Sequence, residues 1–291
     1  MIKFVKFLFK LIFILFFTLV ILDVTYTFVK IKSEPRNKID KIINSKNETF
    51  DVIILGSSRA ENHLVSKMFI KNGYKTFNYG ISGARLDENL LELKLMLENN
   101  FKIKNIILQV DINIENEEYS KVVQAQFMPY FHTSEIIKNH YKKLPNYNSF
   151  FYIPFYRYIY YDTEIGFRET IFTILKKESK ILKNNGFVGL KGTVEVLSFD
   201  KSKNFPQKNN TYEEIKFICK KNKINLISIS TPVCENHNNI YYFKKIIKLY
   251  PEIIDFHSII KNDNYFYSCG HMNEEGAKLF TKIIIDSISI K

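Results

Sequence analysis

The chain has 291 residues, of which 46% are hydrophobic, so it is long enough for one large domain and too apolar to be disordered. Its formal net charge is +12, but the lysines are spread along the whole chain and form no compact cluster, which argues against nucleic-acid binding. We interpret the charge as a general surface property, suited to an anionic lipid or polysaccharide.

The first thirty residues predict an uncleaved transmembrane anchor. Residues 11–22 are uncharged and strongly apolar, with no polar face. A span from Phe4 to Leu22 would measure about 28 Å, close to the thickness of the bilayer core, and Lys10 could extend its charge to the surface. A cleaved signal peptide is the alternative, but no small-x-small site follows Leu22. Basic residues lie on both sides of the span, so charge does not decide its orientation.

Beyond a polar stalk at residues 31–50, the chain alternates strand and helix patterns. A β-branched run at 51–55 predicts a buried strand, which ends at Gly56-Ser57-Ser58. A helix follows from Arg59 through Phe69, then a strand at 75–79, a glycine turn at 80–83, a helix at 85–99 and a strand at 104–110. This βαβαβ order predicts an α/β fold with a parallel sheet, whose functional loops lie at the carboxyl ends of the strands.

Residues 114–210 lose this rhythm and predict a mostly helical insertion. It contains an aromatic cluster at 150–161, a helix at 169–182 and a Gly-rich piece at 186–192. We interpret it as a cover that packs over the core near the membrane. The rhythm returns with a helix at 211–222, a strand at 224–229, a helix at 239–249, a short last strand at 253–256, a loop at 263–270 and a closing helix to Ile285. The predicted organisation is an anchor (1–30), a stalk (31–50) and one domain (51–291).

The Gly56-Ser57-Ser58 turn has two interpretations. A hydroxyl at a helix N-terminus suits a serine nucleophile or a bound anion, because free N–H groups and the helix dipole favour negative charge there. Alternatively, Ser57 or Ser58 simply caps the helix. A nucleophile elbow of the α/β-hydrolase type is disfavoured, since no strand precedes this one.

Three sequence blocks together resemble the SGNH (GDSL-like) hydrolases. Gly56-Ser57-Ser58 is similar to the Gly-Asp-Ser block, residues 78–83 (NYGISG) to the second block, and residues 271–277 (HMNEEGA) to the last. The resemblance covers residues 51–115 and 211–285 and is greatest to a membrane-anchored branch that modifies cell-surface polysaccharide, including D-alanyl-lipoteichoic acid biosynthesis proteins. It implies a three-layer flavodoxin-like SGNH fold with a central parallel sheet.

The resemblance also implies a site and a function. Ser58 matches the nucleophile, His271 the general base, and the N–H groups of Ser58 and Gly83 match oxyanion donors, with Asn113 or Asp111 nearest the place of the third. The implied activity is that of a serine esterase or O-acyltransferase without metal or cofactor, acting on a surface glycan through an acyl-Ser58 intermediate. The implied partners are the bilayer, a glycan or acyl donor, and a membrane acyltransferase. The implied location is the inner or cytoplasmic membrane, single-pass, with the N-terminus inside and the domain outside.

Two departures from the family pattern leave alternatives open. Ser268 stands where the family has an aspartate three residues before the histidine, so Asp263 or Asp255 could substitute, or a Ser–His dyad could suffice. The third block is replaced by residues 109–113 (QVDIN), where Asp111 lies. Arg59 is a candidate for supporting the site or contacting substrate, whereas His63 is interpreted as structural.

Competing hypotheses follow from these departures. An inactive SGNH-like domain could bind glycans or support assembly, and a flavodoxin-like domain could bind a phosphate or nucleotide at the serine turn. The cysteines Cys219, Cys234 and Cys269 are an odd number and predict no disulfide framework. A zinc site using Cys234 with His237 and Cys269 with His271 lacks the paired spacing of structural zinc sites.

Overall fold

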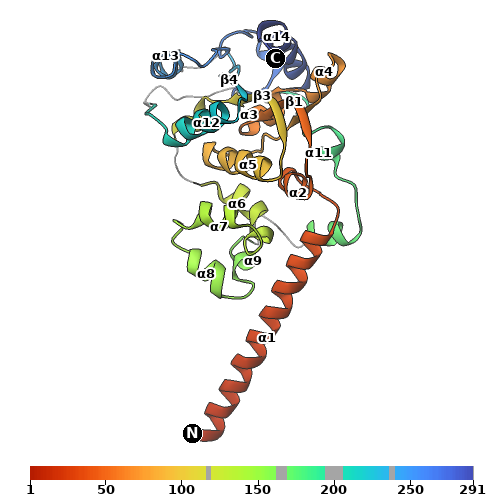
Figure 1. Cartoon of the computed structure of the whole chain (residues 1–291), viewed down its shortest axis with the longest axis vertical. Coiled ribbons are helices and arrows are strands. Elements are labelled where there is room, and N and C mark those ends of the chain that lie inside the picture. The colour runs from red at the N-terminus through yellow and green to blue at the C-terminus, as the bar shows by residue number, and fades with distance from the viewer. Residues whose placement is uncertain (116–118, 162–168, 194–205, 236–239, 291) are drawn as a thin grey trace.

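The computed structural model describes the chain except for residues 116–118, 162–168, 194–205, 236–239 and 291. Helix α1 (Ile2–Lys32) extends away from the remaining elements, with the N-terminus at its far end (Figure 1). It is long and apolar enough to cross a membrane. The rest of the described chain is built around a parallel sheet, as the strand and helix patterns predict.

The central sheet has four strands, all parallel. In spatial order they are β2 (Thr76–Asn78), β1 (Thr49–Leu55), β3 (Lys102–Gln109) and β4 (Asn225–Ile229). β1, the first strand in sequence, lies inside the sheet. The chain places β2 on one side of it, and β3 followed by β4 on the other side. The strand order therefore reverses between β1 and β3, and ligands of doubly wound sheets usually bind at the carboxyl ends of the strands at such a point.

Both faces of the sheet are covered, because successive side chains of a strand point to opposite faces. On β1, Ile53 and Leu55 pack on one face in a core cluster shared with α2 (Lys38–Asn44), α5 (Leu86–Glu98) and α12 (Asn210–Lys221). Val52 and Ile54 pack on the other face with α3 (Ser58–His63), α4 (Ser66–Lys71) and α14 (Glu274–Ser287). α13 (Ile240–Leu249) follows β4 in the chain.

The continuous helix predicted after Ser58 is wrong. The chain forms two short helices, α3 and α4, separated by extended backbone at Leu64 and Val65. The Asn78 side chain donates to the carbonyls of Ala60 and Leu64, and the Thr281 hydroxyl accepts from the Val65 N–H. These long-range hydrogen bonds replace the ones a continuous helix would make.

Two further element predictions need correction. The last strand at 253–256 is reduced to a single parallel bridge between Ile229 and Ile254. The predicted loop at 263–270 contains η3 (Asp263–Tyr265) and β5 (Phe266–Ser268), which pairs antiparallel with β6 (His271–Met272). A two-residue strand is too short to show a period in sequence.

The insertion is helical in its described parts and shares a core with the sheet. In chain order its elements are η1 (Ile112–Glu115), α6 (Lys121–Phe127), η2 (Met128–Tyr130), α7 (Glu135–Tyr141), α8 (Tyr147–Tyr152), α9 (Tyr156–Tyr160) and α11 (Lys180–Lys183). Tyr141, Phe150 and Tyr161 belong to the same buried cluster as the α5 face of the sheet. The helix predicted at 169–182 ends at residue 174, and Lys176 adopts a left-handed φ of 50° before α11.

The predicted stalk at 31–50 is part of the domain. Within it, α2 buries Ile39 and Ile42 completely, and Asn37 caps this helix by accepting from the Asp40 N–H. The Nζ of Lys38 donates to Glu61 at 2.9 Å. Residues directly after α1 are therefore fixed to the core.

The buried carboxyl of Glu92, on α5, should make the stability of the protein depend on pH. Burial raises the pKa of its carboxyl to about 8, against 4.5 as the ordinary value. The folded chain then holds a proton that the unfolded chain releases between these pH values, so the free energy of unfolding falls as pH rises through that range. We expect Glu92→Gln to raise the melting temperature of the full-length protein more at pH 8 than at pH 5. The exposed Glu98→Gln on the same helix is the control, and an equal effect of the two variants at pH 8 would contradict the prediction.

Candidate functional site

The turn after β1 gives its two serines different partners. Gly56 has a φ of 144°, and a Cβ there would lie 2.8 Å from the Gln109 side chain, so the turn requires glycine. Ser57 caps α3, because its hydroxyl accepts from the Arg59 N–H. The N–H and hydroxyl of Ser57 both donate to Gln109 Oε1 at 2.8 Å. The capping role thus falls to Ser57 and leaves the Ser58 hydroxyl for another partner.

Ser58 meets His271 across 213 residues of sequence. The Ser58 Oγ lies 2.8 Å from His271 Nε2, and both residues are half-buried. On the other side of the ring, His271 Nδ1 lies 3.3 Å from the Ser268 hydroxyl. An imidazole that accepts from Ser58 at Nε2 carries its proton at Nδ1, where Ser268 can accept it. The arrangement is a Ser–His pair with a hydroxyl where a triad has a carboxylate.

The environment of His271 keeps its ring neutral. Burial lowers the pKa of His271 below its usual value near 6.5, the Arg59 guanidinium lowers it further, and the Asp111 carboxylate acts in the opposite direction. The unprotonated ring therefore dominates at pH 7. That is the form able to take a proton from a serine.

His63 supports the strand that carries His271. The two rings are perpendicular to each other, with centroids 6.3 Å apart. The fully buried His63 accepts the Met272 N–H at its Nε2, at 3.0 Å. Burial lowers the pKa of His63 well below its usual value, which keeps this nitrogen an acceptor. The contact is structural, in line with the interpretation of His63 from sequence.

The last sequence block forms a strand, a cap and a helix start. The Asn273 side chain accepts from the Gly276 N–H at 3.0 Å and caps α14. The backbone N–H of Asn273 donates to the Tyr265 carbonyl. A Cβ on Gly276 would lie 2.1 Å from that same carbonyl oxygen, so only glycine fits. These contacts fix the start of α14 and, with it, the backbone position of His271 just before the helix.

The second block lies beside the serine turn. Asn78 accepts from the Gly80 N–H, and the Ile81 N–H donates to the Gly56 carbonyl at 3.1 Å. Within the described residues, the N–H of Gly83 has no hydrogen-bond acceptor. It is thus available to a ligand.

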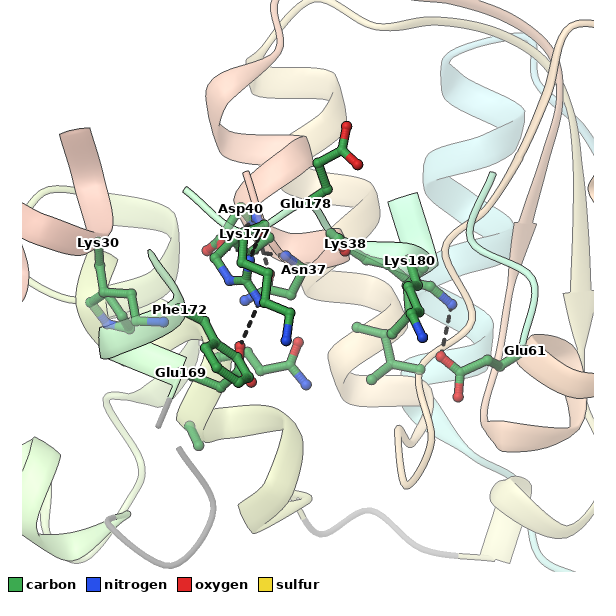
Figure 2. A pocket seen from close by; sticks show the side chains of 17 residues that line it. Lys30, Asn37, Lys38, Asp40, Glu61, Glu169, Phe172, Lys177, Glu178 and Lys180 are labelled. Atoms are coloured by element: carbon green, nitrogen blue, oxygen red, sulfur yellow. Dashed lines mark hydrogen bonds and ion pairs between the residues drawn. The ribbon is translucent and has the colours of Figure 1, made fainter. Parts of the chain in front are cut away.

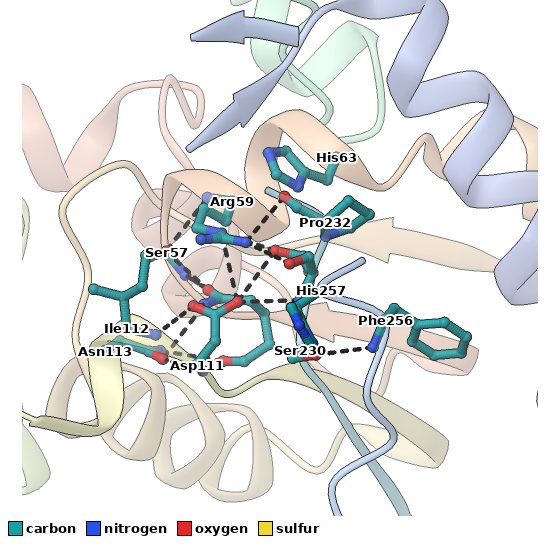
Figure 3. Close-up of polar contacts among 12 residues, drawn as sticks. Ser57, Arg59, His63, Asp111, Ile112, Asn113, Ser230, Pro232, Phe256 and His257 are labelled. Carbon is teal, nitrogen blue, oxygen red and sulfur yellow. Dashed lines mark hydrogen bonds and ion pairs between the residues drawn. The ribbon is translucent and has the colours of Figure 1, made fainter. Parts of the chain in front are cut away.

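A buried ion pair lies next to the serine turn, in the network of Figure 3. Arg59 Nε is 3.4 Å from Asp111 Oδ2, and the side chains are 4% and 0% exposed. Arg59 also donates to the hydroxyl and carbonyl of Thr231 and to the carbonyl of Pro232, and Asp111 accepts from the Thr231 N–H. Arg59 thus joins the ends of β3 and β4, and its side chain is almost completely buried.

Asn113 belongs to the same network. Its Oδ1 accepts from the Asp111 N–H at 3.0 Å, and its amide donates to the Gln109 carbonyl at 3.1 Å. In the part of the chain that the structure describes, no hydrogen bond joins Asn113 to Ser58 or His271.

The two carboxylates considered as a third triad member have other partners. Asp255 lies 2.8 Å from His257 Nδ1, and Asp263 accepts from the Glu235 N–H at 2.9 Å. Within the described residues, neither forms a hydrogen bond or ion pair with His271. The Asp255–His257 pair is two residues apart, and no motif in the sequence indicated it.

A disulfide that the sequence analysis did not foresee lies next to His271. Cys234, after β4, is bonded to Cys269, in the turn between β5 and β6, and Cys219 is buried and free. Two cysteines separated by 35 residues carry no sequence signature of pairing. Neither sulfur is free to ligate zinc while the bond is intact, and His237 lies outside the described residues.

The structure has a cavity of about 520 Å³, shown in Figure 2. It is lined by the end of α1, by α2 and by parts of the insertion. Two ion pairs lie in its lining, Lys38 with Glu61 and Arg36 with Glu169 at 3.3 Å. Neither Ser58 nor His271 lines it. We therefore assign the candidate site from the Ser–His geometry.

Neither the protein-family models nor the curated proteins include a match to this chain. The candidate site consequently depends on the contacts of the chain's own residues.

The disulfide gives a prediction about stability. We expect Cys234→Ser combined with Cys269→Ser to lower the free energy of unfolding by about 2–4 kcal/mol, because the bond restricts the unfolded chain. Thermal unfolding of the full-length protein in detergent measures it. Dithiothreitol should lower the melting temperature of the parent and of Cys219→Ala, but not of the double variant. A parent protein that does not respond to reductant would contradict the prediction.

Proposed function

We propose that this chain is a membrane-anchored serine esterase or O-acyltransferase of the SGNH (GDSL-like) type, acting on a cell-surface glycopolymer. The observation that carries the proposal is the 2.8 Å contact between Ser58 Oγ and His271 Nε2. It joins a hydroxyl at the carboxyl end of β1 to a neutral imidazole at the other end of the chain. A serine within hydrogen-bond reach of a base is the arrangement that nucleophilic catalysis requires.

The reaction proceeds by acyl transfer through Ser58. His271 Nε2 takes the hydroxyl proton as Oγ attacks the acyl carbonyl, and the tetrahedral oxyanion is stabilised by the N–H groups of Ser58 and Gly83. Collapse expels the first alcohol, which receives the proton from His271. Water or an acceptor hydroxyl then attacks the acyl-Ser58, again with His271 as base. The bond from the acyl carbon to Ser58 Oγ breaks, His271 returns the proton to Oγ, and the acid or a new ester is released.

Two observations support the proposed membrane anchoring and the location of the domain. Helix α1 is apolar enough to anchor the chain, and the Cys234–Cys269 bond suits an oxidising compartment outside the cytoplasm. We therefore propose a single-pass protein with its N-terminus inside and its domain outside. A membrane acyltransferase partner would supply the acyl donor.

A second candidate is an inactive SGNH-like domain that binds glycans or supports assembly. The observation in its favour is Ser268, whose hydroxyl contacts His271 Nδ1 at 3.3 Å in place of a carboxylate. A neutral partner orients the ring but does not stabilise the imidazolium that forms when Ser58 attacks.

Labelling of the nucleophile separates these candidates. We expect a fluorophosphonate to modify the full-length protein at Ser58, located by mass spectrometry, because His271 activates that hydroxyl. Ser58→Ala and His271→Ala should both abolish the adduct and the hydrolysis of an activated acetyl ester.

The matched control is Ser57→Ala, which removes the helix cap but leaves the Ser58–His271 pair, and it should still be labelled. Folded parent protein that gives no adduct would remove the enzyme hypothesis and leave the binding role.

Ser268→Asp should increase the activity. A carboxylate beside Nδ1 stabilises the imidazolium, so it should raise the pKa of His271 and increase kcat/KM by about tenfold or more. The parent needs neutral His271, so its kcat/KM should fall only below about pH 6.5, and this acid limb should move to higher pH in the variant. The pH profile of ester hydrolysis measures both effects.

Ser268→Asn is the uncharged control, since it offers an acceptor to Nδ1 without a charge. If Ser268→Asn moved the acid limb as far as Ser268→Asp, the electrostatic explanation would be wrong.

A further inference from the structure

An acidic residue at the end of the apolar run of α1 is held by the insertion. Asp23 follows Leu22 directly, and both its oxygens are paired with the Arg157 guanidinium at 2.7 Å. It also accepts from the Phe155 N–H at 2.6 Å. Arg157 is 1% exposed, so the pair is shielded from water on the side of the insertion.

Aromatic contacts place α9 and the turn before it against the same level of α1. The Tyr26 ring packs on Phe155 and Tyr158, with centroids 5.1 and 5.4 Å away. Thr27 is hydrogen-bonded to the Tyr158 hydroxyl at 2.8 Å. Figure 1 shows α8 and α9 beside the domain end of α1, away from the sheet.

Beside this contact, the α8–α9 surface exposes large apolar side chains. We define it by Phe151, Tyr152, Ile153 and Ile159, of which Tyr152 is 74% exposed and Ile159 is 55% exposed. Apolar side chains grouped in this way on a soluble surface usually mark an interaction site.

We propose that the α8–α9 surface lies in the interfacial layer of the bilayer that α1 crosses. About 20 residues of helix span the hydrocarbon core, so the Phe4–Leu22 span puts Asp23 at its boundary. The insertion contacts α1 from that boundary onward, at the depth of the lipid headgroups. Tyrosine rings favour this layer, because it satisfies their hydroxyl and their apolar ring together. The protein thus has a second contact with the membrane.

Continuity with α1 favours lipid over another occupant. If the domain moved freely relative to α1, Asp23 would be unpaired at the membrane surface. Instead Arg157 neutralises Asp23, and this ion pair holds the α8–α9 surface beside the helix. The inference depends on α1 as the membrane span and is independent of the chemistry at Ser58.

Depth-dependent quenching tests the proposal in the full-length protein. With Cys219→Ala as background, an environment-sensitive fluorophore is attached at Ile159→Cys or, separately, at Tyr152→Cys, and the protein is placed in vesicles containing lipids spin-labelled at the headgroup or deep in the acyl chain. We expect both positions to be quenched at least about threefold more by the shallow label than Phe217→Cys, an exposed position on α12.

Phe13→Cys on α1 is the second control and should respond most to the deep label. Quenching there without quenching at Ile159 or Tyr152 would overturn the proposal while leaving the anchor intact. A blue-shifted emission at Ile159 that no spin-labelled lipid quenches would also overturn it, since the surface would then be covered by protein, such as a second copy of this chain.

Discussion

The buried ion pair of Arg59 and Asp111 is the contact on which the candidate site depends. Each charge loses its hydration, and either one alone would cost several kcal/mol, so the pair and its hydrogen bonds to Thr231 must form together. Those bonds join the carboxyl ends of β3 and β4 to the first turn of α3. Because Arg59 directly follows Ser58, fixing the guanidinium also fixes the backbone that presents the Ser58 hydroxyl.

His271 is held by tertiary contacts, since its two-residue strand provides little by itself. His63 accepts from the next backbone N–H, the Cys234–Cys269 bond closes the turn before it, and Asn273 starts α14 immediately after it. Three separate parts of the chain, at His63, at Cys234 and at residues 269–273, thus fix the backbone that carries the imidazole. The ring itself is oriented by two hydroxyls, Ser58 at Nε2 and Ser268 at Nδ1, where a triad would have a carboxylate at Nδ1.

The parallel sheet could be predicted because buried parallel strands are short β-branched runs, and strands that alternate with helices in a βαβαβ pattern pair in parallel. The Ser58–His271 pairing was also expected, from strand ends and from the family resemblance. The break after α3, the disulfide and the Asp255–His257 pair were not, because each depends on partners that only the folded chain brings close. Thr281, for example, binds a backbone N–H 216 residues earlier, and no local pattern contains that information.

The segment after α1 connects the membrane end to the site. Lys38 of α2 binds both Glu61 and the carbonyl of Gly80, and Ser82 donates to the same Glu61. The loop that carries the proposed oxyanion donor is therefore tied to residues only a few positions beyond the anchor. Under the proposed function, these contacts would hold the site at a single height above the membrane, whereas a site on a flexible stalk could reach acceptors at many heights. Such a restriction would suit an acyl donor delivered at the membrane surface better than a distant part of a polymer.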